Sequence, residues 1–202
     1  MSELERSSSG RKLHLQARAL RQSETRQRIT QAAVELHQQH GPLHTTITAI
    51  AQRAGVERLT VYRHFPDEAS LHEACQQHFF AAHALPNLAL WREISTFPNR
   101  LGVGLDELYE YWDQTQEMFS SVLRDHEVDA KRSGAGVVTF MSKARDALLD
   151  GEDVSGHRGQ ILRAVVGHAV HFYTWRSLVQ DQGLSRTDAV QLMCDTIIRA
   201  AK

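Results

Sequence analysis

The chain has 202 residues, of which 42% are apolar and 23% charged, and its formal net charge is −1 at pH 7. This composition excludes a disordered chain and supplies enough apolar side chains for a core. No apolar run approaches the roughly 18 residues that a membrane span needs, and the first 22 residues lack the apolar stretch of a secretory signal. Two cysteines, Cys75 and Cys194, are too few for a disulfide framework. We therefore expect a cytoplasmic protein.

Charge is distributed unevenly along the chain. Residues 1–66 contain 10 Lys and Arg against 5 Asp and Glu, whereas residues 67–202 contain 13 against 19. A basic N-terminal part on an acidic remainder is typical of a phosphate-binding module attached to a domain that does not bind phosphate. The asymmetry is informative only if the basic part also has a shape that reads DNA.

The N-terminal part of the sequence predicts a basic arm followed by a helix. Residues 1–22 contain a Ser-Gly run, which predicts a flexible arm. Within it, apolar residues between Leu13 and Leu20 could support a short helix that forms only on contact with a partner. An amphipathic segment then runs from Ser23, a suitable N-cap, to His40. Gly41-Pro42 ends this helix, because a C-terminal glycine followed by proline stops helical backbone. The basic residues of the arm are Arg11, Lys12, Arg18 and Arg21.

Two short helices separated by a glycine come next. Thr46 caps the first, whose apolar residues recur at i, i+3, i+4 and i+7. Gly55 lies where a tight turn needs left-handed backbone. The second helix is expected over 57–64, with an inward face formed by Val56, Val61 and Phe65. Pro66-Asp67 ends it and caps a further helix, which ends near Pro86.

The rest of the sequence shows no convincing strand alternation, and glycine and proline separate long helical patterns. Gly102 and Gly104 weaken the start of the first pattern, which we expect to begin nearer Leu105. Ser185 and Asp188 resemble a capping box at the start of the last. Helices are expected at 100–115, 116–124, 135–149, 157–181 and 186–200. The predicted fold class is all-α.

The stretch from Thr45 to Leu71 has a shape that can read DNA. Small side chains at Ala51 and Ala54 let two helices cross closely, which leaves one side of the second helix free of packing. A helix of this size fits the major groove, where Arg pairs with guanine and Thr or Leu touches a thymine methyl group. Tyr and His side chains can donate to phosphate oxygens. The free side presents Arg58, Leu59, Thr60, Tyr62 and Arg63, with His64 close by.

This stretch resembles the DNA-binding region of TetR-family regulators. The family pattern is a Thr-rich cap, Ile-Ala-x-x-Ala-Gly-Val, and then Thr-x-Tyr-x-x-Phe. It stands here as Thr45-Thr46, Ile50-Ala51, Ala54-Gly55-Val56, Thr60, Tyr62 and Phe65. The specific match covers about residues 24–80, and beyond them the likeness rests on helix count and a looser pattern.

The resemblance implies an N-terminal three-helix helix-turn-helix domain and a C-terminal helical bundle domain for ligand binding and dimerisation. We accordingly divide the chain into an arm (1–22), a DNA-binding domain (23–66) and an effector-binding and dimerisation domain (67–202). The implied function is sequence-specific transcription regulation, by family habit repression released by a small-molecule effector.

The resemblance also implies roles for individual residues. Two residues depart from the pattern: Glu57 stands where many members carry a capping Ser, and Glu68 stands where members often carry a phosphate-contacting Lys. The arm residues could compensate for that missing contact by following the DNA backbone or entering the minor groove. The implied DNA contacts are phosphate binding by Thr46 with Thr48 beside it, base reading by Arg58, Leu59 and Thr60, and backbone contacts by Tyr62 and His64, with Arg63 on the same free side.

The sequence of the C-terminal domain predicts a dimer and, less directly, an effector pocket. The segment 157–181 is apolar on two sides, so a second subunit is a natural partner for one of them. The resemblance implies a four-helix interface and a two-fold dimer on a palindromic operator. Large side chains sufficient for an apolar or aromatic effector pocket are present, although each is equally compatible with ordinary core. They are Tyr109, Trp112, Phe119, Phe140, Met141, His168, Phe172 and Trp175.

Other functions find less support in the sequence. The 12 histidines include pairs three residues apart, but no HExxH, paired CxxC or Glu-x-x-His motif accompanies them, so we expect no metal. No phosphate-binding glycine loop or nucleophile elbow is present, so we expect neither an enzyme nor a cofactor. A helical adaptor or ligand-binding protein that uses the same surface for a protein partner is the alternative, and it predicts no steep salt dependence of DNA affinity.

Overall fold

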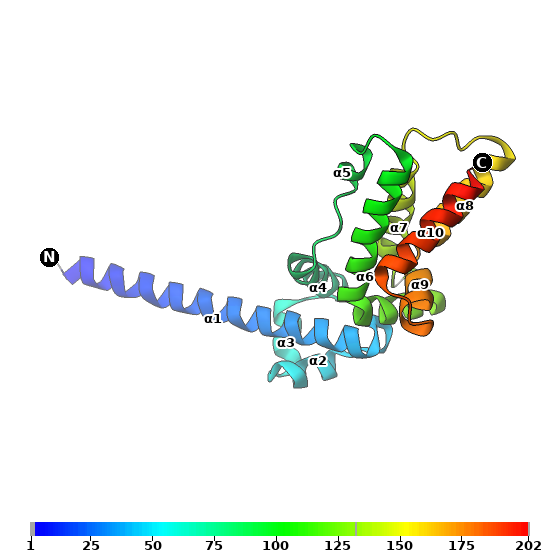
Figure 1. The fold of residues 1–202 in the computed structure, drawn as a ribbon. Coiled ribbons are helices and arrows are strands. Elements are labelled where there is room, and N and C mark those ends of the chain that lie inside the picture. Colours follow the sequence, from blue (N-terminus) through cyan, green and yellow to red (C-terminus); the bar gives the residue numbers. More distant parts are fainter. Residues whose placement is uncertain (1–2, 132, 202) are drawn as a thin grey trace. The chain divides into compact units, whose positions relative to one another are not determined.

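The computed structural model of the chain describes residues 3–131 and 133–201, with side chains from His14 onward. Helices make up the fold of these residues, and no strand occurs among them (Figure 1), which confirms the predicted all-α class. The chain divides into two compact units, Met1–Ala82 and His83–Lys202. Within the described ranges, no helix combines the length and the apolar character that crossing a membrane requires.

The first unit is built on one long helix, against which the shorter helices pack. Helix α1 contacts α2 and α4, and α3 contacts α2. The elements of the first unit are α1 (Glu3–His40), the 3₁₀ turn η1 (Pro42–His44), α2 (Ile47–Ala54), α3 (Arg58–His64) and α4 (Glu68–Ala82). Ile29, Ala33 and Leu36 of α1 are buried, as the predicted amphipathic face requires.

Helix α1 begins at Glu3 and passes through Ser23, so the expected N-cap at Ser23 and the separate flexible arm are not observed. The physical reason is composition, because Ala, Leu, Arg, Gln and Glu dominate from residue 13 onward and no Pro or Gly interrupts them before Gly41. The N-terminal part of α1 is therefore a helical extension (Figure 1), in which Arg18 and Arg21 are exposed. The side chains of Arg11 and Lys12 lie outside the described residues.

The first unit extends past the expected boundary at residue 66 to include α4. Leu71, Cys75 and Phe79 on this helix are buried, and the Cys75 thiol lies 4.0 Å from the Thr30 carbonyl oxygen of α1. Burial also raises the pKa of Cys75 to about 12, so the thiol stays protonated and serves as packing. Helix α4 therefore packs as part of the first unit.

The second unit surrounds the long helix α6, which packs against α5, α7, α9 and α10. Helix α8 packs in turn against α7 and α10. The elements are α5 (Leu88–Arg92), α6 (Phe97–Val128), α7 (Ala135–Leu148), α8 (Gly156–Ala169), α9 (Phe172–Trp175), the π-helical turn η2 (Arg176–Asp181) and α10 (Arg186–Ala200). The helix α5 was not predicted.

Helix α6 replaces the two helices predicted at 100–115 and 116–124, and it begins eight residues before Leu105. The helix runs through Thr115 and Gln116 without a break, and the Thr115 hydroxyl donates a hydrogen bond to the Tyr111 carbonyl oxygen four residues earlier. The glycine at 104 serves packing: an added Cβ would lie 2.5 Å from Leu148 and 3.1 Å from Trp91. A residue that weakens a helix in isolation is thus required here for close contact.

The helix predicted at 157–181 is broken into α8, α9 and η2. His171 supplies the physical reason, because its backbone is extended and its Nδ1 accepts a hydrogen bond from Tyr173 N, capping α9. The predicted helices at 135–149 and 186–200 are confirmed by α7 and α10. The predicted capping box is present, with Ser185 Oγ accepting from Asp188 N at 3.1 Å and donating to Asp188 Oδ2 at 2.6 Å.

A buried arginine ties the start of α6 to the end of α7. Arg100 is 5% exposed, and its guanidinium donates to the carbonyl oxygens of Leu148 (2.9 Å), Ile94 (2.9 Å) and Asp150 (2.5 Å). Its remaining hydrogen bond goes to the carboxylate of Glu152 at 3.0 Å. Because carbonyls and a carboxylate surround the charge, its burial is compensated.

Candidate nucleic-acid interface

The helix-turn-helix is fixed by local capping at both ends of α2. Thr46 has extended backbone, and its Oγ1 accepts a hydrogen bond from Ala49 N at 3.1 Å. Gly55 has φ +65°, the left-handed conformation predicted for it, and Val56 N donates to the Ala51 carbonyl oxygen at 3.0 Å. The cap and the glycine turn expected from the sequence are therefore confirmed.

Helix α3 buries one side and exposes the other. Val61 is fully buried, and Phe65, directly after the helix, is 2% exposed. Leu59 and Tyr62 are 64% and 44% exposed although both carry large apolar surface. The exposed residues of this side are Arg58, Leu59, Tyr62 and Arg63, and Thr60 and His64 are half-buried beside them. The residues that the sequence assigned to base reading and to backbone contact thus lie together on α3, whereas Thr46 and Thr48 lie at the start of α2.

Arg26 of α1 holds the C-terminal end of α3. Its Nη1 donates a hydrogen bond to the His64 carbonyl oxygen at 2.6 Å, and its guanidinium lies over the Phe65 ring, 4.0 Å from the centroid. A cation at the C-terminus of a helix is favourable because the carbonyls there carry partial negative charge. The sequence did not reveal this contact, because its acceptor is a backbone oxygen 38 residues away.

His64 is kept neutral by its surroundings. Burial lowers the pKa of His64, and the positive charges of Arg26 and Arg63 lower it further. At neutral pH the imidazole therefore has one N–H donor and one acceptor nitrogen rather than a positive charge. It can hydrogen-bond a phosphate oxygen but adds no charge to a DNA contact.

The first residues of α2 and α4 complete the surface of the motif. Thr48 is the second residue of α2 and is exposed, two residues after the cap residue Thr46. Asp67 Oδ1 accepts from Ser70 N at 2.7 Å and so caps α4, as expected, and this bond lowers the pKa of Asp67. Glu68 occupies the first turn of α4, whereas Glu57 at the N-cap of α3 makes no side-chain capping hydrogen bond.

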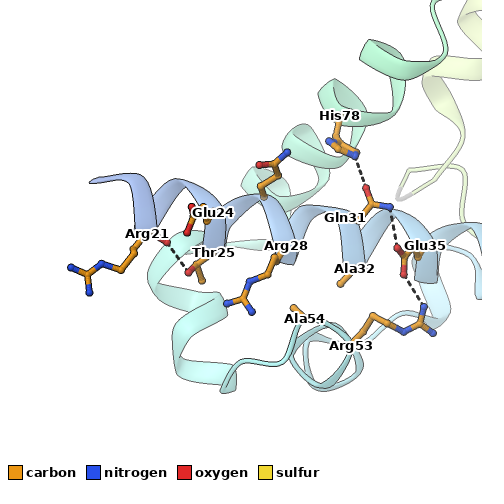
Figure 2. A pocket seen from close by; sticks show the side chains of 11 residues that line it. Arg21, Glu24, Thr25, Arg28, Gln31, Ala32, Glu35, Arg53, Ala54 and His78 are labelled. Carbon is orange, nitrogen blue, oxygen red and sulfur yellow. Dashed lines mark hydrogen bonds and ion pairs between the residues drawn. The ribbon is translucent and has the colours of Figure 1, made fainter. Parts of the chain in front are cut away.

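An open groove of about 910 Å³ lies along α1, bordered by α2 and by His78 of α4. Figure 2 shows the side chains that line it. A chain of contacts crosses it from helix to helix: His78 to Gln31 at 2.7 Å, Gln31 to Glu35 at 3.0 Å and Glu35 to Arg53 at 3.0 Å. Hydrogen bonds from Gln31 and Arg53 lower the pKa of Glu35, so its carboxylate is ionised at neutral pH. This chain of contacts joins α4, α1 and α2, and it was not predicted from the sequence.

The residues predicted for an effector pocket are mostly gathered in the core of the second unit. Trp112 of α6 lies 5.0 Å from Phe119, 6.3 Å from Phe140 and 5.6 Å from Phe172 between ring centroids. Trp175 lies 5.3 Å from Phe172. These rings form one aromatic cluster, consisting of Trp112, Phe119, Phe140, Phe172 and Trp175.

The remaining predicted pocket residues lie in different surroundings. His168 is exposed, unlike the buried residues with which it was grouped. Tyr109 is fully buried and donates its hydroxyl to the Ala169 carbonyl oxygen at 3.0 Å, and Met141 is 5% exposed. Tyr111, which was not predicted, joins the aromatic cluster at 5.5 Å from Trp112 and 5.6 Å from Phe119.

The described residues contain no group of three or more His, Cys, Asp or Glu placed to hold a metal ion. No curated protein matches the sequence significantly. A family model described as bacterial regulatory proteins of the tetR family matches residues 29–75, which run from α1 through the helix-turn-helix into α4.

Solved structures resemble most of the chain. A tetR-family transcriptional regulator from Streptomyces coelicolor has a TM-score of 0.61 and 21% identity, over 88% of this chain and 80% of that one. A mutant of HlyIIR has a TM-score of 0.52 and 16% identity, over 86% and 94%. NalD, the secondary repressor of the MexAB-OprM multidrug efflux pump in Pseudomonas aeruginosa, has a TM-score of 0.51 and 18% identity, over 88% and 96%.

At these identities the solved structures establish the fold, and the family model establishes the N-terminal domain. Members of this family are DNA-binding regulators rather than enzymes. Residues 29–75 thus match the model of the tetR family's DNA-binding domain, and the chain shares the fold of solved TetR-family transcription regulators.

Proposed function

We propose that this protein is a repressor that binds a palindromic operator as a homodimer and releases it when a small molecule enters the second unit. In this proposal Arg58, Leu59 and Thr60 read bases, while Tyr62, Arg63 and His64 contact the DNA backbone. Thr46 and Thr48 contact phosphates at the start of α2. The protein acts on the chromosome, in the cytoplasm.

One observation carries the DNA-binding role: α3 exposes Leu59 and Tyr62 beside two arginines while Val61 and Phe65 anchor its other side. An exposed apolar and basic helix face is costly for a surface that only meets water, but it suits a major groove with thymine methyl groups and guanine acceptors. Arg58 and Leu59 lie in the first turn of α3, which is the part of a recognition helix that reaches base edges.

The domain organisation follows from the same elements. Residues 3–82 supply the DNA-binding unit, including α4, and residues 83–201 supply effector binding and dimerisation. The helical extension before residue 22 carries Arg18 and Arg21 on its exposed surface, where they can follow the phosphate backbone. Removal of residues 1–21 should then lower operator affinity and flatten its salt dependence.

Helices α8 and α10 support the dimer. They pack against each other, yet Ile161 of α8 is 42% exposed and Leu192 of α10 is 47% exposed. The exposed Ala164 lies one turn after Ile161 and leaves room for close approach of a second helix. A partner copy that covers these side chains would form a four-helix interface with two-fold symmetry. Sedimentation at micromolar concentration should give a dimer, and Leu192→Glu should weaken it.

The effector role is assigned to the aromatic cluster of the second unit, to which five of the eight predicted pocket residues belong. Release of DNA by an effector requires that it binds the non-binding conformation better than the DNA-bound one. Of the elements that carry the aromatic cluster, α6 contacts both α7 and α9, so a molecule among the rings can bias their arrangement.

Selection of bound DNA from a random pool, followed by titration of the selected operator, tests the function. Sequences with two-fold symmetry should be enriched. Arg58→Ala should then relax discrimination at one base position per half-site by about 1–3 kcal/mol. Tyr62→Phe is the matched control for a phosphate contact, because it should weaken all sequences equally. Unselective enrichment, with no consensus after repeated rounds, would refute a sequence-specific regulator and favour a helical adaptor.

A further inference from the structure

Three aromatic side chains in the core of the second unit each have a polar atom without a hydrogen-bond partner. Among the described residues these are Nε1 of Trp112, Nε1 of Trp175 and the hydroxyl of Tyr111. Both tryptophans are fully buried and Tyr111 is 5% exposed. A buried donor without a partner bears the full cost of leaving water, so three of them in one core need an explanation.

Other buried aromatic polar groups in this unit do have partners. Trp91 Nε1 donates to the Glu107 carboxylate at 2.7 Å, and the Tyr109 hydroxyl donates to the Ala169 carbonyl oxygen at 3.0 Å. The chain therefore satisfies such groups elsewhere, and the exceptions coincide with the aromatic cluster. Trp112 and Trp175 both contact Phe172, at 5.6 Å and 5.3 Å, and Tyr111 contacts Trp112 at 5.5 Å.

The chemistry of these atoms restricts what can bind them. An indole N–H is a donor and cannot accept, and a tyrosine hydroxyl donates as well as accepts. A partner for all three must therefore supply hydrogen-bond acceptors. The surrounding walls are aromatic rings, which favour a planar apolar body stacked or edge-on against them.

The charges of the unit argue against an anionic ligand. Arg100 is a buried cation of the second unit, but its guanidinium is already occupied by three carbonyl oxygens and Glu152. An anion in the aromatic cluster would lose its hydration without gaining a counter-ion.

One wall of the aromatic cluster is a short helix next to a π-helical turn. Phe172 and Trp175 lie on α9, which has four residues, and α9 is followed directly by the π-helical turn η2. π-Helical turns are rare and occur frequently at functional sites. Movement of α9 would part the rings while the longer helices α6 and α7 keep their hydrogen bonds.

We propose that the effector is a neutral aromatic molecule of one or two rings that bears carbonyl-type acceptors. It lies between the rings of the aromatic cluster and accepts hydrogen bonds from Trp112, Trp175 and Tyr111 as α9 moves aside. This inference rests on the proposed function, since it names the ligand class for the effector role.

Three naphthalene probes separate the ligand classes. 1-Acetonaphthone is neutral with an acceptor, 1-ethylnaphthalene has similar shape without one, and 1-naphthoate is anionic. Titration of the full chain by calorimetry should give 1-acetonaphthone an affinity about five- to tenfold above that of 1-ethylnaphthalene, the gain from a hydrogen bond. 1-Naphthoate should bind most weakly. Equal binding of the first two, strongest binding of the anion, or no binding of any probe would overturn the proposal.

Variants that keep the ring but remove the donor locate the site. Trp175→Phe and Tyr111→Phe should each reduce the preference for 1-acetonaphthone over 1-ethylnaphthalene, whereas Trp91→Phe, the matched control, should leave it unchanged. Tyr111→Phe alters one unpartnered atom, so it keeps the test available if a tryptophan variant does not fold. An unchanged preference in both donor variants would place the ligand elsewhere and refute the site.

The outcome is distinguishable from that of the proposed function. Operator binding by the full chain is measured by selection and titration without any probe. If operator binding is sequence-specific and 1-acetonaphthone does not bind, the ligand class is wrong and the regulator stands. If 1-acetonaphthone binds with the predicted preference and no operator is selected, the site stands and the regulator is refuted.

Discussion

Arg26 is predicted to position the recognition helix rather than to contact DNA. Its guanidinium is held by the protein itself, through the 2.6 Å hydrogen bond to the His64 carbonyl oxygen and the 4.0 Å stacking distance to the Phe65 ring. Arg26→Ala removes both contacts and leaves Phe65 without its cover. The end of α3, and with it Tyr62 and Arg63, then loses its attachment to α1.

The structure sets the size of the effect. A hydrogen bond to a charged donor contributes about 1.5–3 kcal/mol, and exposure of Arg26 to solvent reduces this to about 1 kcal/mol. The cation–π contact adds about 0.5–1 kcal/mol at an exposed site. If the loss of about 1.5–2 kcal/mol falls on the placement of α3, operator affinity should drop by about 10- to 30-fold per subunit.

The assay is fluorescence anisotropy with a labelled operator, repeated with single-base variants and at several salt concentrations. Arg26→Ala should reduce affinity and discrimination while leaving the salt slope unchanged, because no phosphate contact is lost. Arg28→Ala, an exposed arginine on the same helix, is the control for a change of charge. Arg26→Lys should restore little, since an ammonium lacks the planar stacking face.

Two results would refute this reasoning. Unchanged affinity of Arg26→Ala for the operator would show that the end of α3 needs no attachment to α1. A salt slope reduced by about one with discrimination intact would show that Arg26 binds phosphate instead.

Three further predictions concern stability. Gly55→Val should lower the free energy of unfolding by about 1–2 kcal/mol in urea, because φ at this position is +65°. No atom lies within 4 Å of an added Cβ, so the cost is backbone strain and Gly55→Asn should cost less. Equal costs for the two variants would show that backbone strain is not the cause. Arg100→Met should lower the free energy of unfolding by about 3–5 kcal/mol, because it leaves buried carbonyl oxygens and Glu152 without their donor. A loss below about 1 kcal/mol, measured by thermal unfolding, would contradict the role of these hydrogen bonds. Burial lowers the pKa values of His72 and His171, so the unfolded chain binds more protons and the free energy of unfolding should fall as pH drops below about 6.5. The double variant His72→Gln with His171→Gln should remove this part of the pH dependence, and an unchanged plot of unfolding free energy against pH would contradict the prediction.

Local sequence patterns predicted the helix-turn-helix because its determinants are local. The Thr46 cap, the left-handed turn at Gly55 and the buried Val61 each depend on neighbours within a few residues. The same applies to the start of α10, where Ser185 and Asp188 bond to each other. Such features can be identified from a single sequence without knowledge of the tertiary structure.

The features that were missed depend on distant contacts. Gly104 appeared to weaken a helix, but tertiary packing against Leu148 explains why it lies inside α6. The break before α9 depends on the His171 side chain capping a backbone amide, and a histidine in an apolar stretch gives little indication of this. Arg26 acts on a carbonyl oxygen far along the chain, so no sequence motif marks it.

The effector site was predicted in part, because large apolar side chains identify a core without showing which polar atoms lack partners. Trp112, Phe119 and Phe172 were predicted and lie together in the aromatic cluster. His168 lies on the same face of the predicted helix 157–181 as Trp175, but that helix is broken in the structure and the His168 side chain is exposed. Tyr111 was overlooked because its unpartnered hydroxyl can be recognised only in the folded chain.

The salt dependence of operator affinity tests the central claim, that this chain is a DNA-binding regulator, most directly. If α2, α3 and the helical extension of α1 contact phosphates, the logarithm of the association constant should fall linearly with the logarithm of salt concentration, by about 0.9 per phosphate neutralised. The account predicts a slope of several units together with a preference for the selected operator over scrambled DNA at every salt concentration. A slope near zero, with equal affinity for both sequences, would contradict it.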